Sequence, residues 1–63
     1  MYVFVGTVSD LQSVVRTQGG RIVWRIQPVN HGDEPAIVSV DDDGRIWSRP
    51  DFYGSMLELG HIE

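Results

Sequence analysis

The chain has 63 residues and no cysteine, which excludes the disulfide frameworks and thiolate-bound zinc sites that stabilise many very small proteins. A domain of this length buries only about 60% of the surface that its unfolded chain exposes, so its apolar core is small. Self-association is then the remaining common source of stability. We therefore expect one small β domain, residues 1–63, that forms a homodimer.

The charge of the chain argues against several classes of partner. At a formal net charge of −4, it lacks the excess of basic residues on which nonspecific binding to DNA or to an anionic membrane depends. Its longest apolar run, residues 1–5, is too short for a membrane span or a signal peptide. We expect a cytoplasmic protein without a membrane partner.

Apolar runs between turn residues predict a mostly β structure. Residues 2–8 are rich in branched and aromatic side chains and predict a strand, with Gly6 at a bulge or a close approach. The edge of this strand carries no charged residue, and we expect it to form the dimer contact through Tyr2 or Phe4. The alternative is a monomer in which this strand closes a barrel against the C-terminal segment.

Residues 36–40 and 45–49 predict a second pair of strands around an acidic turn. A three-residue turn with Gly44 in the left-handed conformation places Val40 opposite Ile46. It also places Asp41 opposite Arg45, so that opposite charges meet beside the turn. One face then collects Val38, Val40 and Ile46, and the other face carries Trp47.

Residues 11–18 are ambiguous between helix and strand. Leu11, Val14 and Val15 have helical spacing, but Gly19-Gly20 between two apolar runs is typical of a tight hairpin. We favour the hairpin, whose apolar face is a second candidate for the dimer contact. In its register one face carries Val15, Thr17, Ile22, Trp24 and Ile26.

The remaining segments predict a loop and a short helical turn. Residues 27–35 contain two prolines and a polar stretch, which are typical of a loop. After Pro50, a short helical turn would align Phe52, Met56 and Leu59 and end at Gly60. The predicted fold is mainly all-β: a small, strongly bent antiparallel sheet or SH3-like barrel with a short C-terminal helical turn.

The segment Gly-Arg-Ile-Trp-Ser-Arg-Pro at residues 44–50 resembles, in outline, part of the small uncharacterised SH3-like β proteins of bacteria and their phages. The resemblance covers residues 19–59. It implies a compact SH3-like fold and a bacterial or phage origin, and it assigns no activity.

No pattern in the sequence indicates catalysis or a cofactor. The run Asp41-Asp42-Asp43-Gly44 lacks the spaced oxygen ligands and distant glutamate of a calcium loop and is typical of a turn. The two histidines, His31 and His61, lack the spacing of zinc ligands. The sequence contains no nucleophile elbow and no phosphate loop, so we expect a protein that is not an enzyme.

Arginine beside tryptophan is the most distinctive binding pattern in the chain. Such pairs anchor protein interfaces or stack on nucleotide bases. Trp24 is expected in the core, whereas Trp47 is either packed under the C-terminal turn or exposed. The candidate binding residues are Trp47, Arg45, Arg49, Arg25 and Arg21.

From these residues we expect a non-enzymatic protein-binding module, of the kind that a phage or mobile element uses to modulate a host protein. The alternative is a small β-barrel that binds nucleic acid through arginine and aromatic side chains. The two differ in whether the arginines form one surface away from the acidic turn.

Overall fold

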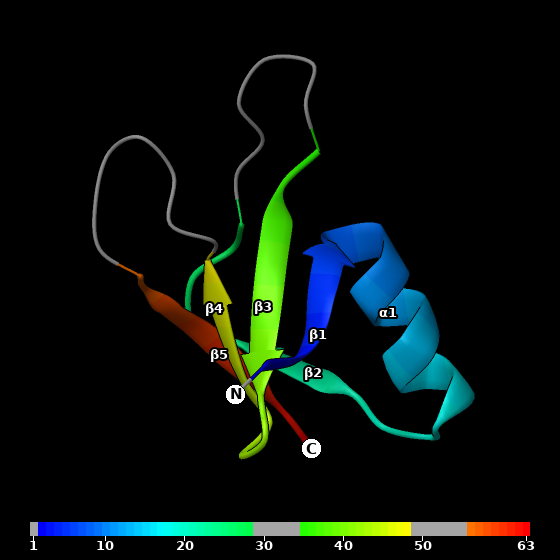
Figure 1. Cartoon of the computed structure of the whole chain (residues 1–63). Helices are drawn as coiled ribbons and strands as arrows, with labels where there is room; N and C mark the ends of the chain where they lie inside the picture. Colours follow the sequence, from blue (N-terminus) through cyan, green and yellow to red (C-terminus); the bar gives the residue numbers. More distant parts are fainter. Residues whose placement is uncertain (1, 29–34, 49–55) are drawn as a thin grey trace.

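The computed structural model describes residues 2–28, 35–48 and 56–63 (Figure 1). In this part of the chain, five antiparallel strands form one sheet, accompanied by one short helix, which confirms the prediction of a mainly β fold. The elements are β1 (Tyr2–Thr7), α1 (Val8–Thr17), β2 (Ile22–Trp24), β3 (Ile37–Asp41), β4 (Arg45–Ser48) and β5 (Glu58–Ile62).

The strand order is β1-β3-β4-β5-β2, so β1 and β2 are the two edges of the sheet. The helix α1 carries the chain from one edge to the other, and Figure 1 shows it on the side of β1 away from β3. β1 pairs with β3 and not with β5, so the described strands do not close a barrel against the C-terminal strand. An SH3-like closure and the homodimer stay predictions.

The β3–β4 hairpin forms in the predicted register. Val40 pairs with Ile46, and Gly44 has a φ of 81°, the left-handed conformation that the three-residue turn requires. The N–H of Gly44 donates to the carbonyl of Asp41 at 3.1 Å. Val38 is buried on the same face as Val40 and Ile46, as predicted.

The first predicted hairpin is wrong, because residues 8–17 form the helix α1. Thr7 caps its start, where the Oγ1 atom accepts the N–H of Asp10 at 3.1 Å. The Gly-Gly pair ends it: Gly19 has a φ of 76°, and the N–H of Gly20 donates to the carbonyl of Val15 at 2.9 Å. This is a Schellman cap, which needs positive φ just as a hairpin turn does.

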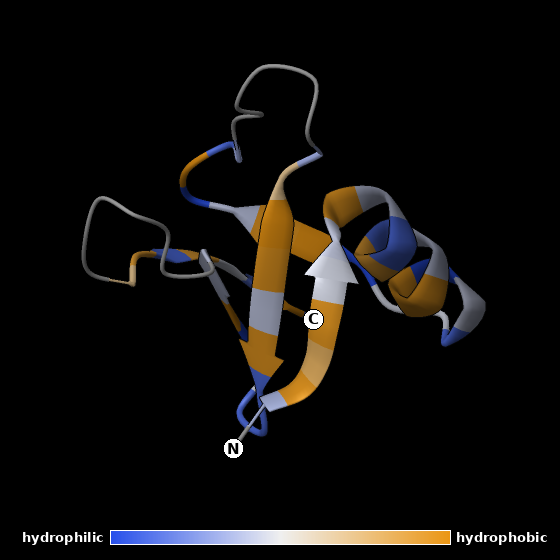
Figure 2. Cartoon of the chain, turned by 45° about the horizontal axis from the view of Figure 1, so that its top comes forward, coloured by the Kyte–Doolittle hydropathy of each residue, from blue (hydrophilic) through white to orange (hydrophobic). Residues whose placement is uncertain are grey.

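The core lies between α1 and one face of the sheet. It consists of Leu11, Val15, Val38, Val40, Ile46 and Leu59, with Phe4, Val8, Ile22, Trp24 and Ile62 packed around it. Hydrophobic residues recur along β1 and β3 and on part of α1 (Figure 2). Trp24 therefore packs against the core as predicted, whereas Ile26, which the hairpin register placed on the same face, is 49% exposed.

Two local predictions along β1 and at the C-terminus differ from the structure. At Gly6 the bulge is wrong, because Gly6 pairs regularly with Val38 and the irregularity in β1 falls between Tyr2 and Phe4. The alternative, a close approach, is confirmed, because a Cβ atom at Gly6 would lie 3.0 Å from Phe4 Cζ. Residues 58–62 form β5 instead of the end of a helical turn, and residues 51–55, where that turn was to begin, lie outside the described residues. Within the described chain, no helix is long and apolar enough to cross a membrane.

Gly60 allows β2 to pair closely with β5. A Cβ atom at this position would lie 2.1 Å from the Val23 carbonyl oxygen and 3.0 Å from the Trp24 Cα atom. Both are backbone atoms, so a rotamer change could not relieve the clash. The pairing of β2 with β5 thus depends on a residue without a side chain.

We expect Gly60→Ala to lower the free energy of unfolding by more than about 2 kcal/mol, because the β2 backbone must move away from β5. The control is Gly19→Asn, where an added Cβ atom would meet no atom within 4 Å beyond the chain neighbours and asparagine tolerates positive φ. Urea unfolding followed by tryptophan fluorescence measures both. Equal stability of Gly60→Ala and the wild type would contradict this packing.

Adjacent valines in α1 test the helix against the hairpin. Val15 is 4% exposed and Val14 is 41% exposed. We expect Val15→Ala to cost about 1–3 kcal/mol through lost burial, and Val14→Ala to be neutral or slightly stabilising because alanine favours a helix. A clear loss of stability from Val14→Ala would contradict the helix, because alanine is favoured in a helix and disfavoured in a strand.

Candidate functional site

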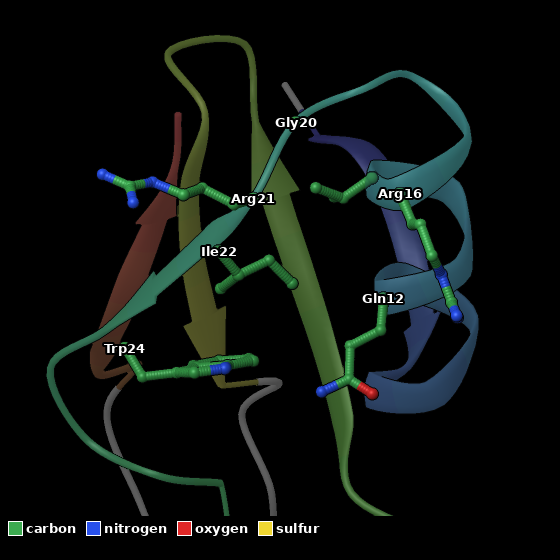
Figure 3. Close-up of a pocket in the computed structure, with 7 residues that line it drawn as sticks. Gln12, Arg16, Gly20, Arg21, Ile22 and Trp24 are labelled. Atoms are coloured by element: carbon green, nitrogen blue, oxygen red, sulfur yellow. The ribbon is translucent and has the colours of Figure 1, made fainter.

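A cavity of about 250 Å³ lies between α1 and β2 (Figure 3). We call it the α1–β2 groove, and its walls include Gln12, Val15, Arg16, Arg21, Ile22 and Trp24. In Figure 3 the Trp24 ring closes one end, and the Gln12 side chain extends along the helix side. The apolar floor is thus joined to a polar rim, a combination found in many ligand sites.

The backbone of β2 presents an unpaired edge to this groove. Arg21 and Glu63 exchange both of their backbone hydrogen bonds, at 3.1 and 2.8 Å, and the N–H of Arg25 donates to the Leu59 carbonyl at 2.7 Å. In an antiparallel ladder, alternate residues point their backbone groups toward the partner strand. The N–H and C=O groups of Ile22 and Trp24 therefore point away from β5.

No strand pairs with this side of β2 in the described part of the chain, because β2 ends the strand order. Ile22 and Trp24, which carry the outward backbone groups, also line the groove. The groove therefore combines hydrogen-bonding groups of an open strand edge with an apolar cavity. This is the arrangement in which an extended peptide can be added to a sheet.

The described side chains of the predicted binding residues lie on the other side of the sheet, which we call the outer face, although Arg21 also borders the groove. Val23 pairs with His61, and His61 pairs with Arg45, so these three side chains share this face. Arg21 and Arg25 are two residues from Val23 and also belong to it. The structure thus brings three of the predicted arginines together, whereas Arg49 lies outside the described residues.

Carboxylates neutralise much of this arginine group. Arg21 donates to Glu63 Oε2 from Nε at 2.8 Å and from Nη2 at 2.5 Å, and this hydrogen bond lowers the pKa of Glu63. Arg25 Nη1 lies 3.9 Å from Glu58 Oε2. In the described chain the outer face therefore alternates charges and offers no continuous basic surface.

Trp47 is half-buried on the outer face. It is thus neither fully packed nor fully exposed, which were the two alternatives from the sequence. Its Nε1–H donates to Asp41 Oδ2 at 3.0 Å. The second oxygen, Asp41 Oδ1, accepts the backbone N–H groups of Asp43 and Arg45 at 3.0 and 2.9 Å. The indole bond is the largest cause of a lowered pKa at Asp41. Asp41 thus fixes both the turn and the indole.

An apolar patch on and beside β1 adjoins Trp47. Tyr2, Val3 and Val5 are 49%, 66% and 56% exposed, and the Tyr2 hydroxyl lies 3.9 Å from the Met56 sulfur. Val5 pairs with Ser39, which pairs with Trp47, so this row crosses three strands. The patch is therefore a second exposed apolar surface, separate from the α1–β2 groove.

The described residues contain no cluster of three or more metal-ligating side chains. His61 Nε2 lies 3.6 Å from Glu63 Oε1, and His31 is outside the described residues. The acidic run forms a turn, as predicted from its composition, and the Asp41 carboxylate accepts the backbone N–H groups of Asp43 and Arg45.

Sequence reasoning missed the α1–β2 groove because it placed residues 14–17 in a strand. The helical spacing of Leu11 and Val15 was the signal that could have revealed it. That spacing puts Gln12 and Arg16 together on the helix, one turn apart, beside the strand edge.

Comparison of the chain with protein-family models, with characterised proteins and with solved structures found no match. Inferences about its function therefore rest on its own residues.

We expect Asp41→Asn to release the Trp47 indole while keeping the turn. The amide oxygen of asparagine can still accept the two backbone N–H groups, but its NH₂ group cannot accept the indole N–H. The Trp47 Nε1–H resonance in NMR spectra should move toward that of a free indole and exchange faster with solvent. An unchanged resonance would contradict the hydrogen bond.

The same bond predicts a direction of pH dependence. Because the pKa of Asp41 is lowered in the folded protein, its stabilising contribution is present above the unfolded pKa and is lost as the pH falls through the folded pKa. The Trp47 resonance should titrate at a pH below the usual aspartate range in the wild type. This titration should be absent in Asp41→Asn.

Proposed function

We propose that this protein is a non-enzymatic protein-binding module, and that it takes an extended segment of its partner into the α1–β2 groove. The observation that carries the proposal is the unpaired edge of β2 at Ile22 and Trp24, which faces a cavity of about 250 Å³. Added strands gain main-chain hydrogen bonds from such an edge and selectivity from a neighbouring pocket. As expected from the sequence, the partner would be a host protein that a phage or mobile element modulates.

The cavity is large enough for a side chain of the incoming segment. A water molecule occupies roughly 30 Å³ in the liquid, several times less than the groove volume. Val15, Ile22 and Trp24 supply apolar walls, and alternate side chains of an added strand would point toward them. One apolar side chain would therefore be buried for each segment bound.

Nucleic-acid binding is the less supported alternative. Single-strand binding sites combine aromatic platforms with a positive groove, whereas the outer-face arginines Arg21 and Arg25 lie beside Glu63 and Glu58. The net charge of −4 also disfavours binding to a polyanion.

A library of random linear peptides displayed on phage tests the proposal. We expect the protein to enrich peptides that, once synthesised, shift the backbone amide resonances of Ile22 and Trp24 most strongly, because these N–H groups gain acceptors. Gln12→Trp should weaken binding at least tenfold by filling the groove. The matched control Ser13→Trp, on the same helix but outside the groove lining, should leave affinity within twofold.

Three outcomes would overturn the proposal. The first is that the library gives no enrichment, and the second is that the enriched peptides shift the amide resonances around Trp47 instead of those of β2. The third is that an oligothymidylate probe binds at low salt while the peptides do not.

A further inference from the structure

We infer that the α1–β2 groove selects an extended segment that carries an acidic side chain two residues from its buried apolar one, and that Arg16 binds this carboxylate. This inference rests on the proposed function and adds the chemistry of the partner. It concerns a residue that the sequence did not single out as a binding residue.

The charge of the groove differs in sign from the charge of the chain. The net charge is −4, yet among the described residues the two charged ones that line the groove are arginines, Arg16 and Arg21. A carboxylate inside the groove would therefore meet attraction locally, although the protein as a whole repels acidic partners. A single acidic residue fits this field better than a strongly acidic segment.

The two arginines are not equivalent. Arg21 is engaged by Glu63, and Figure 3 shows its guanidinium turned away from the cavity. Arg16 forms no ion pair with any described residue. In Figure 3 its side chain runs along α1 and lies farther from β2 than that of Gln12, which turns toward the cavity. Arg16 is thus the guanidinium that is available to a ligand.

Gln12 and Arg16 are one helical turn apart and line the same wall. A guanidinium can bind a carboxylate through two parallel N–H bonds, and an adjacent amide NH₂ group can donate a third. In a strand added to β2, side chains two residues apart point to the same face. When one of them enters the apolar floor, the next one on that face is placed to reach the Arg16 wall.

Three displayed peptide libraries test this inference. Each fixes its central position, as Asp or Glu, as Asn or Gln, or as Lys or Arg, and varies the others. We expect the wild type to enrich the acidic library at least tenfold over the amide library. Arg16→Glu should shift the preference to the basic library, because the charge of the groove wall is reversed.

The matched control is Arg25→Glu, which makes the same charge change on the outer face, outside the groove lining. It should keep the acidic preference. Equal enrichment of the acidic and amide libraries would overturn the inference and leave the peptide-binding proposal standing, as would a reversed preference in Arg25→Glu. No enrichment of any library would overturn both. The thermal unfolding of each variant, compared with the wild type, separates lost binding from lost folding.

Discussion

The fold depends on the packing of α1 against one face of the sheet. Leu11 and Val15 from the helix are buried among Val38, Val40 and Ile46 of the sheet. Without this contact the sheet would have one uncovered apolar face, which a chain of 63 residues could not offset elsewhere. The helix also joins β1 to β2, which are the two edges of the sheet, so its length helps to set how far apart those edges lie.

The α1–β2 groove is a consequence of the same arrangement. The helix covers the core but leaves a cavity beside β2, where Ile22 and Trp24 turn their backbone groups away from β5. Gly60 contributes from the opposite side, since only a residue without Cβ lets β2 approach β5 so closely. The features that hold β2 in place on one side thus leave its other side open.

The sequence predicts the β3–β4 hairpin well because its signals are local. Gly44 lies at the position that requires positive φ, and the alternation of Val38, Val40 and Ile46 admits one register. The acidic turn is equally local, because the Asp41 carboxylate accepts N–H groups only two and four residues away.

The first half of the chain could not be predicted in this way. Gly19-Gly20 serves a hairpin turn and a helix cap equally well, because both need positive φ at a glycine. The choice between them depends on whether Leu11 and Val15 find partners on β3 and β4, more than 20 residues away along the chain. The pairing of Arg21 with Glu63 and the demand for glycine at position 60 are also long-range effects. The arginines were therefore predicted as a binding group, but not their carboxylate partners.

The open edge of β2 is the claim on which the functional account rests, and amide hydrogen exchange measures it residue by residue. The account predicts strong alternation along residues 21–25: the amides of Val23 and Arg25, which face β5, exchange slowly, and those of Ile22 and Trp24 exchange quickly. Equal protection of all four amides would show that another segment covers the edge. That result would contradict the account, because no site for an added strand would remain.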